Sequence, residues 1–198
     1  MNSYPVYFQN KIIDKREVKL NFTSPAVQYG IHPFEGISCL NINDKNYLFR
    51  LKEHINRLIN SCNKLGIEIE NNFDELFNKS IFYIKKINPK EDLNIRLSVF
   101  PLEGSWSSEL LFGTVLISGF STATQLLANT QNQLNLKLTK ITKTSKQSID
   151  QSIKVGANYL NARYAHLEAR KEQFDSCLLA DDNGFISESG GSNIFFIK

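Results

Sequence analysis

The sequence predicts an α+β fold in two parts, of which the second is shorter. Three observations support this prediction. In the first 120 residues, segments with an apolar residue at every second position alternate with segments of helical period. Residues 121–133 are rich in Ser, Thr, Ala, Gln and Asn and follow neither period. Strand and helix signals then resume. We therefore predict an N-terminal α/β domain over 1–120, an interdomain linker over 121–133, and the start of a C-terminal domain over 134–198.

Strands in the N-terminal part are predicted from period-two patterns and from turn residues between them. Asn43 to Asn46, for example, form a polar turn sequence between two apolar runs. The predicted strands lie at 6–8, 12–13, 36–42, 47–50, 93–99 and 110–120, and a further extended stretch carries Val18, Leu20 and Phe22.

Two helices are predicted between these strands. Apolar residues recur at helical spacing from Ile55 to Leu65, and Gly66 is expected to end that helix. A second helix follows Asn72, a suitable N-cap, and runs to about Ile84.

In the C-terminal part we expect four elements. They are a strand over 134–138, a helix over 158–173, a hairpin joining 177–179 to 185–187, and an apolar strand at 194–197.

The composition predicts a soluble protein with a hydrophobic core. Of its 198 residues, 41% are apolar and 22% are charged, and the formal net charge is +3. This small, evenly spread positive charge argues against nucleic acid or an anionic membrane as a partner. No stretch approaches the roughly 18 consecutive apolar residues of a membrane span, and no secretory signal is visible at the N-terminus. We therefore expect a cytoplasmic protein.

Cysteine and histidine spacing predicts no metal site. Cys39, Cys62 and Cys177 are far apart and form no CxxC pair, which favours reduced thiols packed in the core. The histidines at positions 32, 54 and 166 lack the spacing of metal ligands. No glycine-rich nucleotide-binding loop is present.

Lys154 is the candidate catalytic residue. Small residues follow it, and a helix is predicted to begin at Asn158. The positive field at a helix N-terminus favours the neutral, nucleophilic amine of a lysine just before it. The alternative is a solvated surface charge, which is the commoner role of lysine. Composition alone does not separate Lys154 from the other lysines.

Four segments carry motifs in collinear order. Residues 29–37 read Tyr-Gly-Ile-His-Pro-Phe-Glu-Gly-Ile, and residues 54–58 read His-Ile-Asn-Arg-Leu. Residues 154–160 read Lys-Val-Gly-Ala-Asn-Tyr-Leu, and residues 184–195 contain Gly-Phe-Ile-Ser-Glu and Asn-Ile-Phe. Together these segments resemble the class IV aminotransferases, which include branched-chain aminotransferases, D-amino-acid transaminases and aminodeoxychorismate lyases. The lysine segment is most similar to that of the branched-chain enzymes.

The resemblance implies fold type IV of the pyridoxal-phosphate enzymes, with an N-terminal α/β sandwich and a mixed α/β barrel-like C-terminal domain. That second domain is expected to be incomplete here, because family members continue beyond the Asn-Ile-Phe strand. A chain that ends on an apolar strand favours truncation, since an unpaired apolar edge invites aggregation. A naturally short relative that covers this edge by dimerisation is the alternative.

The resemblance also implies pyridoxal 5'-phosphate as the cofactor and assigns roles to four residues. Lys154 would form the Schiff base and then move the proton. Arg57 would bind the phosphate through its guanidinium fork. Glu188 would keep the pyridine nitrogen protonated, and Tyr159 would bond the phenolic oxygen of the cofactor.

Each of these roles has a structural alternative. Arg57 could be a surface arginine beside Glu53, and Glu188 could be an exposed glutamate on a strand. Tyr159 could be a core aromatic on the helix face that carries Ala162.

Three residues are expected on the substrate side. The resemblance places Tyr29 and Phe34 in the side-chain pocket, and Arg96 opposite the distal carboxylate of glutamate. Arg96 alternates with the apolar face of its strand, so it points either to solvent or into a cleft. Two positions depart from the branched-chain pattern, because Ser38 stands where an arginine is usual and Asn94 where an aromatic is usual.

The predicted function is transfer of an amino group between an amino acid, with branched-chain amino acids as candidates, and a 2-oxo acid, in a homodimer. Within the same fold, a D-amino-acid transaminase or an aminodeoxychorismate-lyase-like enzyme is the alternative. From another class, the chain could be a non-catalytic interaction module that keeps the fold. A basic RNA-binding domain has little support, because aromatic and basic residues do not interleave.

Overall fold

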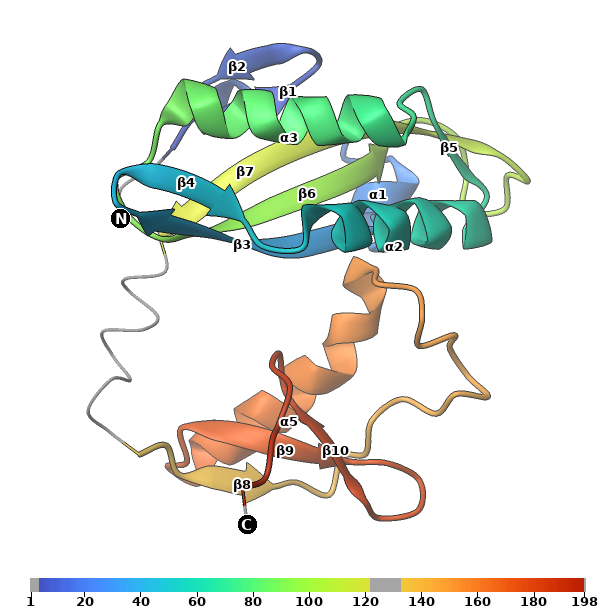
Figure 1. Cartoon of the computed structure of the whole chain (residues 1–198). Coiled ribbons are helices and arrows are strands. Elements are labelled where there is room, and N and C mark those ends of the chain that lie inside the picture. The colour runs from blue at the N-terminus through green and yellow to red at the C-terminus, as the bar shows by residue number, and fades with distance from the viewer. Residues whose placement is uncertain (1–3, 122–132, 198) are drawn as a thin grey trace. The chain divides into compact units, whose positions relative to one another are not determined.

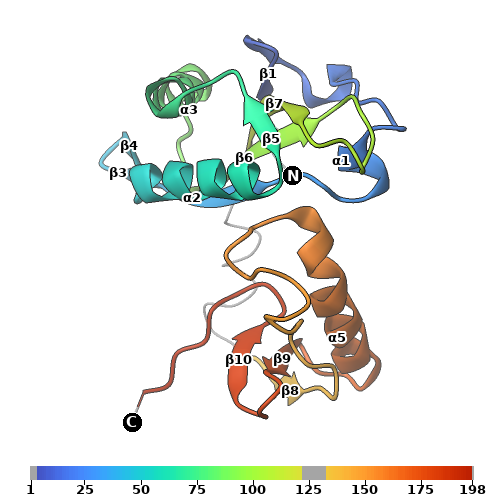
Figure 2. The ribbon, with the colours of Figure 1, turned by 90° about the vertical axis from the view of Figure 1, so that its right-hand side faces the viewer.

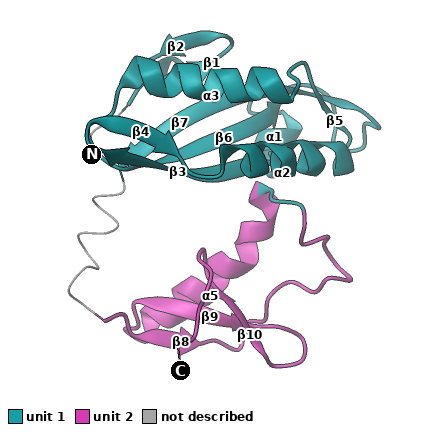
Figure 3. Ribbon diagram, in the orientation of Figure 1, with its two compact units in different colours: residues 1–127, 153–155 teal, residues 128–152, 156–198 magenta. Residues whose placement is uncertain are grey.

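A computed structural model describes residues 4–121 and 133–197. The chain divides into two compact units, residues 1–127 with 153–155 and residues 128–152 with 156–198 (Figure 3). The predicted linker over 121–133 lies, except for its two end residues, outside the described residues, so the domain boundaries stay a prediction. Residues 153–155 belong to the first unit although they follow a segment of the second. Local sequence patterns do not predict such a return.

The first unit is built on a mixed sheet of seven strands in its described part, in the order β2-β1-β7-β6-β3-β4, with β5 also paired to β7 (Figure 1). Only the β5–β7 pair is parallel among these ladders. The strands are β1 (Val6–Phe8), β2 (Lys11–Ile13), β3 (Phe34–Ile42), β4 (Lys45–Leu48), β5 (Ile67–Ile69), β6 (Leu93–Pro101) and β7 (Leu111–Ser121). The predicted strands of this part are therefore confirmed, except for the stretch at 18–22.

Two helices, α2 (Leu51–Lys64) and α3 (Phe73–Ile87), lie on the same side of this sheet (Figure 2). Their apolar stripes and the inward residues of the strands form one core, in which Ile55, Leu76 and Leu97 are completely buried. A short helix, α1 (Pro25–Gln28), precedes β3. One face of the sheet is therefore covered by helices, as the alternating burial along β6 requires.

The ends of α2 and α3 follow the capping residues in the sequence. Asn72 accepts a hydrogen bond from the Glu75 backbone N–H at 3.0 Å, and the Glu75 side chain bonds back to the Asn72 N–H at 2.9 Å. After α2, Gly66 adopts a φ of +63°, and a Cβ there would lie 2.7 Å from the Glu109 carbonyl oxygen. Both predicted helix limits are confirmed.

The extended stretch predicted around Val18, Leu20 and Phe22 is wrong as a strand. A 3-10 helix occupies Lys15–Glu17, and residues 18–22 join no ladder in the described part of the chain. Phe22 is 75% exposed. A period-two pattern forms a strand only when another strand satisfies its backbone groups, and no neighbour does so here.

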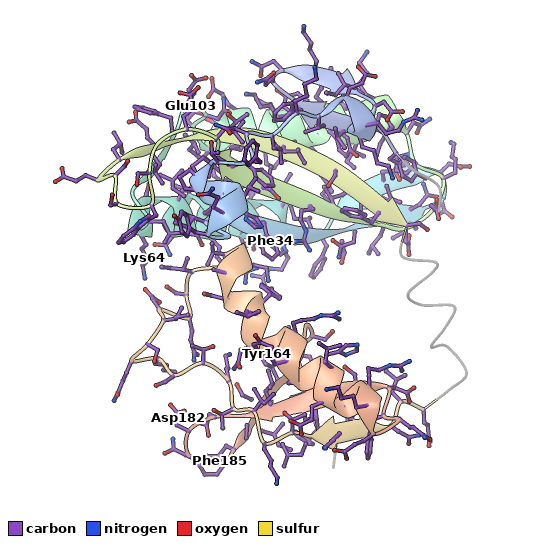
Figure 4. The ribbon with its side chains drawn as sticks, turned by 180° about the vertical axis from the view of Figure 1, so that it is seen from behind. Phe34, Lys64, Glu103, Tyr164, Asp182 and Phe185 are labelled. Atoms are coloured by element: carbon purple, nitrogen blue, oxygen red, sulfur yellow. The ribbon has the colours of Figure 1, made fainter. Side chains whose placement is uncertain are left out.

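The second unit has a three-stranded sheet in the order β10-β9-β8, with β8 parallel and β10 antiparallel to β9. Helix α5 packs on β9 through a small core that contains Ala165, Ala169 and Cys177. On its outer surface Tyr164 is exposed, and Phe185 stands beside Asp182 at the tip of the hairpin (Figure 4). The elements are β8 (Leu136–Leu138), a 3-10 helix (Gly156–Tyr159), α5 (Leu160–Lys171), β9 (Ser176–Ala180) and β10 (Ile186–Ser189).

Two predictions for this unit need correction. The helix expected from residue 158 begins at Leu160, because a 3-10 turn takes up the preceding residues. The strand expected at 194–197 does not form: these residues pair with no described strand, and Ile197 is 99% exposed. An apolar run needs a pairing partner as much as it needs β propensity.

The cysteines are buried and free, as predicted. Burial raises the pKa of Cys39 to about 11 and that of Cys62 to about 12, so both thiols are protonated and unreactive at neutral pH. No helix in the described ranges is long and apolar enough to cross a membrane.

Gly113 marks a tight contact between β7 and its neighbours. A Cβ at this position would overlap Val99 Cγ1 and lie 2.9 Å from Ile67 Cγ2. We expect Gly113→Ala to lower the free energy of unfolding of the first unit by about 1–3 kcal/mol. Chemical denaturation and hydrogen exchange of the β6–β7 amides would measure this. Gly191→Ala is the control, because nothing lies within 4 Å of its added Cβ, and equal stability of the two variants would contradict the prediction.

Candidate active site

Three polar residues share one face of α2. His54, Arg57 and Ser61 are spaced three and four residues apart, which places them in a row beside the buried stripe that carries Ile55 and Leu58. The Ser61 hydroxyl donates to the Arg57 carbonyl at 2.9 Å. When the apolar stripe packs against the sheet, this row faces β3.

Glu35 on β3 contacts two residues of this row, His54 and Arg57. Its side chain is completely buried, and it accepts hydrogen bonds from Arg57 Nε and Nη2, both at 2.5 Å, and is paired with His54 Nδ1 at 2.8 Å. Burial raises the pKa of this carboxyl, but the hydrogen bonds and charges of Arg57 and His54 outweigh it and hold the pKa below its usual range. Glu35 is therefore an ionised carboxylate in the core side of the sheet.

The backbone of Lys154 is held between α2 and β3. Its N–H donates to the buried Ser61 hydroxyl at 3.2 Å, and its carbonyl accepts from the Phe34 N–H at 3.1 Å. Val155 extends this contact through an isolated β-bridge with Pro33. Because residues 153–155 belong to the first unit, the backbone of Lys154 lies beside Phe34, the first residue of β3.

The Phe34 ring lies close to two cations. Lys154 Nζ is 5.1 Å and the Arg96 guanidinium carbon 4.0 Å from the ring centroid, distances at which the ring attracts a positive charge. His32 stacks on Phe100 at 5.1 Å with an interplanar angle of 4° and approaches Phe34 at 6.4 Å. Burial lowers the pKa of His32, so its ring is neutral at pH 7. The buried Phe34 side chain is labelled in Figure 4.

The β3–β6 ladder explains the position of Arg96. Gly36 lies opposite Arg96, and Ser38 opposite Asn94, so alternation puts all four on the same face as Phe34. From the sequence alone, the Arg96 side chain is expected to point either to solvent or into a cleft. Its side chain is exposed but lies over the Phe34 ring. Ser38 and Asn94, the two positions that depart from the branched-chain pattern, therefore lie near Arg96 on one face of the sheet.

The remaining candidates lie elsewhere. Tyr29 ends α1 and is 49% exposed. In the second unit, Glu188 follows a shift in the register of β10, its side chain is 37% exposed, and it pairs with Lys143 at 3.3 Å. Tyr159 is 38% exposed at the end of the 3-10 helix, and its alternative role as a core aromatic is therefore wrong.

The contacts of Arg57 also differ from those of the alternative role, a surface arginine beside Glu53. Arg57 does not pair with Glu53, which bonds Arg50 at 3.0 Å, but with Glu35. The first unit thus brings together Lys154, Phe34 and Arg96, with Arg57 one helical turn before Ser61.

Sequence reasoning missed Glu35, His54 and Ser61 as site residues. Glu35 stands inside the Phe-Glu-Gly motif at a core-facing position of β3, and a charged residue at such a position is itself a signal. The sequence shows only that His54 lacks the spacing of a metal ligand, whereas in the structure its Nδ1 contacts Glu35. Among residues 4–121 and 133–197, no group of three His, Cys, Asp or Glu side chains could hold a metal ion.

Comparisons with known proteins agree on one family. The family model described as amino-transferase class IV matches residues 34–198. A probable branched-chain-amino-acid aminotransferase of Aquifex aeolicus is 26% identical over 194 residues, which are 97% of this chain and 62% of that protein. The branched-chain-amino-acid aminotransferase of Escherichia coli K12 is 26% identical over 202 residues, 98% of this chain and 63% of its own length.

Solved structures give the same result. The Escherichia coli branched-chain amino acid aminotransferase superposes with a TM-score of 0.87 at 25% identity, over 96% of this chain and 64% of that one. The T.th. branched-chain amino acid aminotransferase complexed with N-(5'-phosphopyridoxyl)-L-glutamate gives 0.86 at 25% identity, over 100% and 65%. The predicted fold class, α+β of fold type IV, is confirmed. The chain spans less than two thirds of the length of these relatives.

The buried charge of Glu35 makes Arg57 important for stability. We expect Arg57→Met to lower the free energy of unfolding by about 3 kcal/mol, because it removes the main partner of a buried carboxylate. Denaturant unfolding followed by circular dichroism would measure this. Adding Glu35→Gln should restore most of the loss, since no buried charge then remains. If the double variant is no more stable than Arg57→Met, the loss has another origin.

Proposed function

Because this chain belongs to the class IV aminotransferase family, we propose that it uses pyridoxal 5'-phosphate to move an amino group between an amino acid and a 2-oxo acid. The observation that carries the proposal is the fixed position of Lys154. Its backbone is bonded on one side to Ser61 and on the other to Phe34, next to the helix that carries Arg57.

The side chains fit the chemistry of this cofactor, which needs an amine for its aldehyde, a cation for its phosphate and a carboxylate for its ring nitrogen. Lys154 supplies the amine and Arg57 the guanidinium. Glu188 supplies the carboxylate, held in place by Lys143. Tyr159 is the proposed hydroxyl donor to the cofactor.

When bound, pyridoxal phosphate supplies an electron sink for the α-carbon of an amino acid. Lys154 would supply the amine that takes up the proton leaving the α-carbon. Arg57 would bind the phosphate through the N–H groups of its planar guanidinium. Glu188 holds a proton on the ring nitrogen by its negative charge.

Arg96, Phe34 and Tyr29 serve the substrate side of this proposal. Arg96 is an exposed residue whose guanidinium lies over Phe34, and we propose that it pairs with the distal carboxylate of a dicarboxylic substrate such as glutamate. Both solved relatives named above are branched-chain enzymes, and a branched-chain amino acid is the second substrate that we propose. Ser38 and Asn94 add polar groups beside Arg96, which favours the dicarboxylic partner.

We further propose that the protein works in the cytoplasm as a homodimer. The three buried, free cysteines support a reducing compartment. Extensive apolar surface supports association: Tyr164, Phe185 and Phe195 are 57%, 72% and 85% exposed.

The cofactor site is tested by borohydride reduction of the protein with pyridoxal phosphate, followed by peptide mapping. We expect the phosphopyridoxyl label on Lys154, because its backbone is fixed by Ser61 and Phe34 and its Nζ lies 5.1 Å from the Phe34 ring centroid. Lys154→Ala should lose the label and the absorbance of the bound cofactor. Lys146→Ala is the matched control, since this lysine lies in the polar loop between β8 and the 3-10 helix. A label that maps to another lysine would contradict the site assignment.

Turnover separates an enzyme from a module that only binds the cofactor. A binding module would take the label at Lys154 but convert no amino acid to its oxo acid. Loss of the substrate's α-proton without oxo-acid formation would instead favour a lyase-like activity.

Arg96 is expected to select dicarboxylic substrates. Removal of its charge in Arg96→Met should raise the KM for glutamate by about tenfold or more, the cost of a lost charge-assisted hydrogen bond. The KM for leucine, which has no distal carboxylate, should change much less. Steady-state or half-reaction kinetics with both amino acids would measure this. An equal change for both would show that Arg96 acts on the fold and not on the substrate.

A further inference from the structure

We propose that Glu35 is a positioning residue for cofactor binding, which orients the Arg57 guanidinium toward the phosphate and is itself held by His54. This inference rests on the proposed function, because it takes Arg57 as the phosphate ligand. Glu35 would not touch the cofactor and would act through Arg57.

Stability alone does not explain a carboxylate at this position. Glu35 is completely buried on β3, and Ile37 and Cys39, on the same face, are apolar and equally buried. Removing a charge from water costs several kcal/mol, and buried ion pairs can often be replaced by apolar residues without loss of stability. An apolar residue would therefore satisfy the core. A charged side chain, unlike an apolar one, also fixes the orientation of the Arg57 guanidinium.

The geometry of the pair fixes the plane of the guanidinium. Arg57 Nε donates to Glu35 Oε1 and Arg57 Nη2 to Oε2, both at 2.5 Å, so two parallel bonds hold the fork. The Arg57 side chain is otherwise 48% exposed, and an exposed arginine samples many rotamers. With the fork held before the cofactor binds, less conformational entropy is lost on binding phosphate.

The same helix offers a contrast. Arg50 and Glu53 also form an ion pair on α2, but a single oxygen, Glu53 Oε1, accepts both N–H groups at 3.1 and 3.0 Å. Their side chains are 62% and 56% exposed. Such a surface pair restrains an arginine weakly. Burial and bidentate geometry therefore distinguish the Glu35–Arg57 pair from an ordinary helical ion pair.

His54 completes the arrangement. It lies on the same face of α2 one turn before Arg57, and its Nδ1 is 2.8 Å from Glu35 Oε2. Since the ionised carboxylate only accepts, Nδ1 carries the proton and donates. The His54 side chain is 21% exposed, so it shields the pair from water. The carboxylate is thus held at both oxygens and cannot rotate away from Arg57.

The test compares the affinities of pyridoxal phosphate and of pyridoxal, which lacks the phosphate, by absorbance titration of the full chain. Glu35→Gln should weaken the binding of pyridoxal phosphate about tenfold or more, the range found when an orienting partner is lost at a metal ligand. Pyridoxal affinity should stay nearly unchanged. Glu53→Gln, at the exposed pair, should change neither. Equal weakening of both ligands, or of neither, by Glu35→Gln would overturn the proposal.

Two milder variants keep the test decisive if Glu35→Gln does not fold, which a thermal melt would show. Glu35→Asp keeps the charge but shortens the reach, and His54→Asn removes the second donor. Each should lower the preference for pyridoxal phosphate over pyridoxal about threefold or more, the effect of one weakened hydrogen bond. An unchanged preference in both would overturn the inference. If the wild-type chain neither binds pyridoxal phosphate nor takes the label at Lys154, the proposed function itself has failed.

Discussion

One buried negative charge organises the candidate site of the first unit. A carboxylate with no access to water must be neutralised by partners in the protein, and Glu35 finds two of them on α2. This requirement sets the rotation of α2 about its axis, because His54 and Arg57 must face β3 while the apolar stripe faces the core. The same rotation presents Ser61 to the backbone of Lys154. A single electrostatic constraint therefore links the arginine and the lysine.

The period of β3 lets one strand serve two purposes. Neighbouring residues point to opposite faces, so Glu35 meets α2 while Phe34 lies on the face that carries Arg96. The ring has Lys154 Nζ and the Arg96 guanidinium within the range of cation–π attraction. Phe34, the first residue of β3, thus brings the Arg96 guanidinium and the Lys154 amine to one aromatic ring.

Much of the fold was predictable because its signals are local. The period of 55–65 and the Asn72 capping box specify α2 and α3 without reference to the rest of the chain, and so does the turn between β3 and β4. Predictions failed where a strand needs a partner: residues 18–22 and 194–197 have strand patterns but join no described ladder. The hydrophobic period of a segment does not show whether another strand will form hydrogen bonds with its backbone.

By itself the sequence determined the family, because four motifs in collinear order resemble the class IV aminotransferases. It also predicted the groups of the site, an amine, a guanidinium and a carboxylate at Lys154, Arg57 and Glu188. Only the tertiary structure decided which groups meet. It placed residues 153–155 against β3, gave Arg57 a buried partner 22 positions away, and put Ser38 and Asn94 beside Arg96. Hydrogen bonds and ion pairs between distant segments depend on strand register and helix rotation, and both are settled by packing of the whole core.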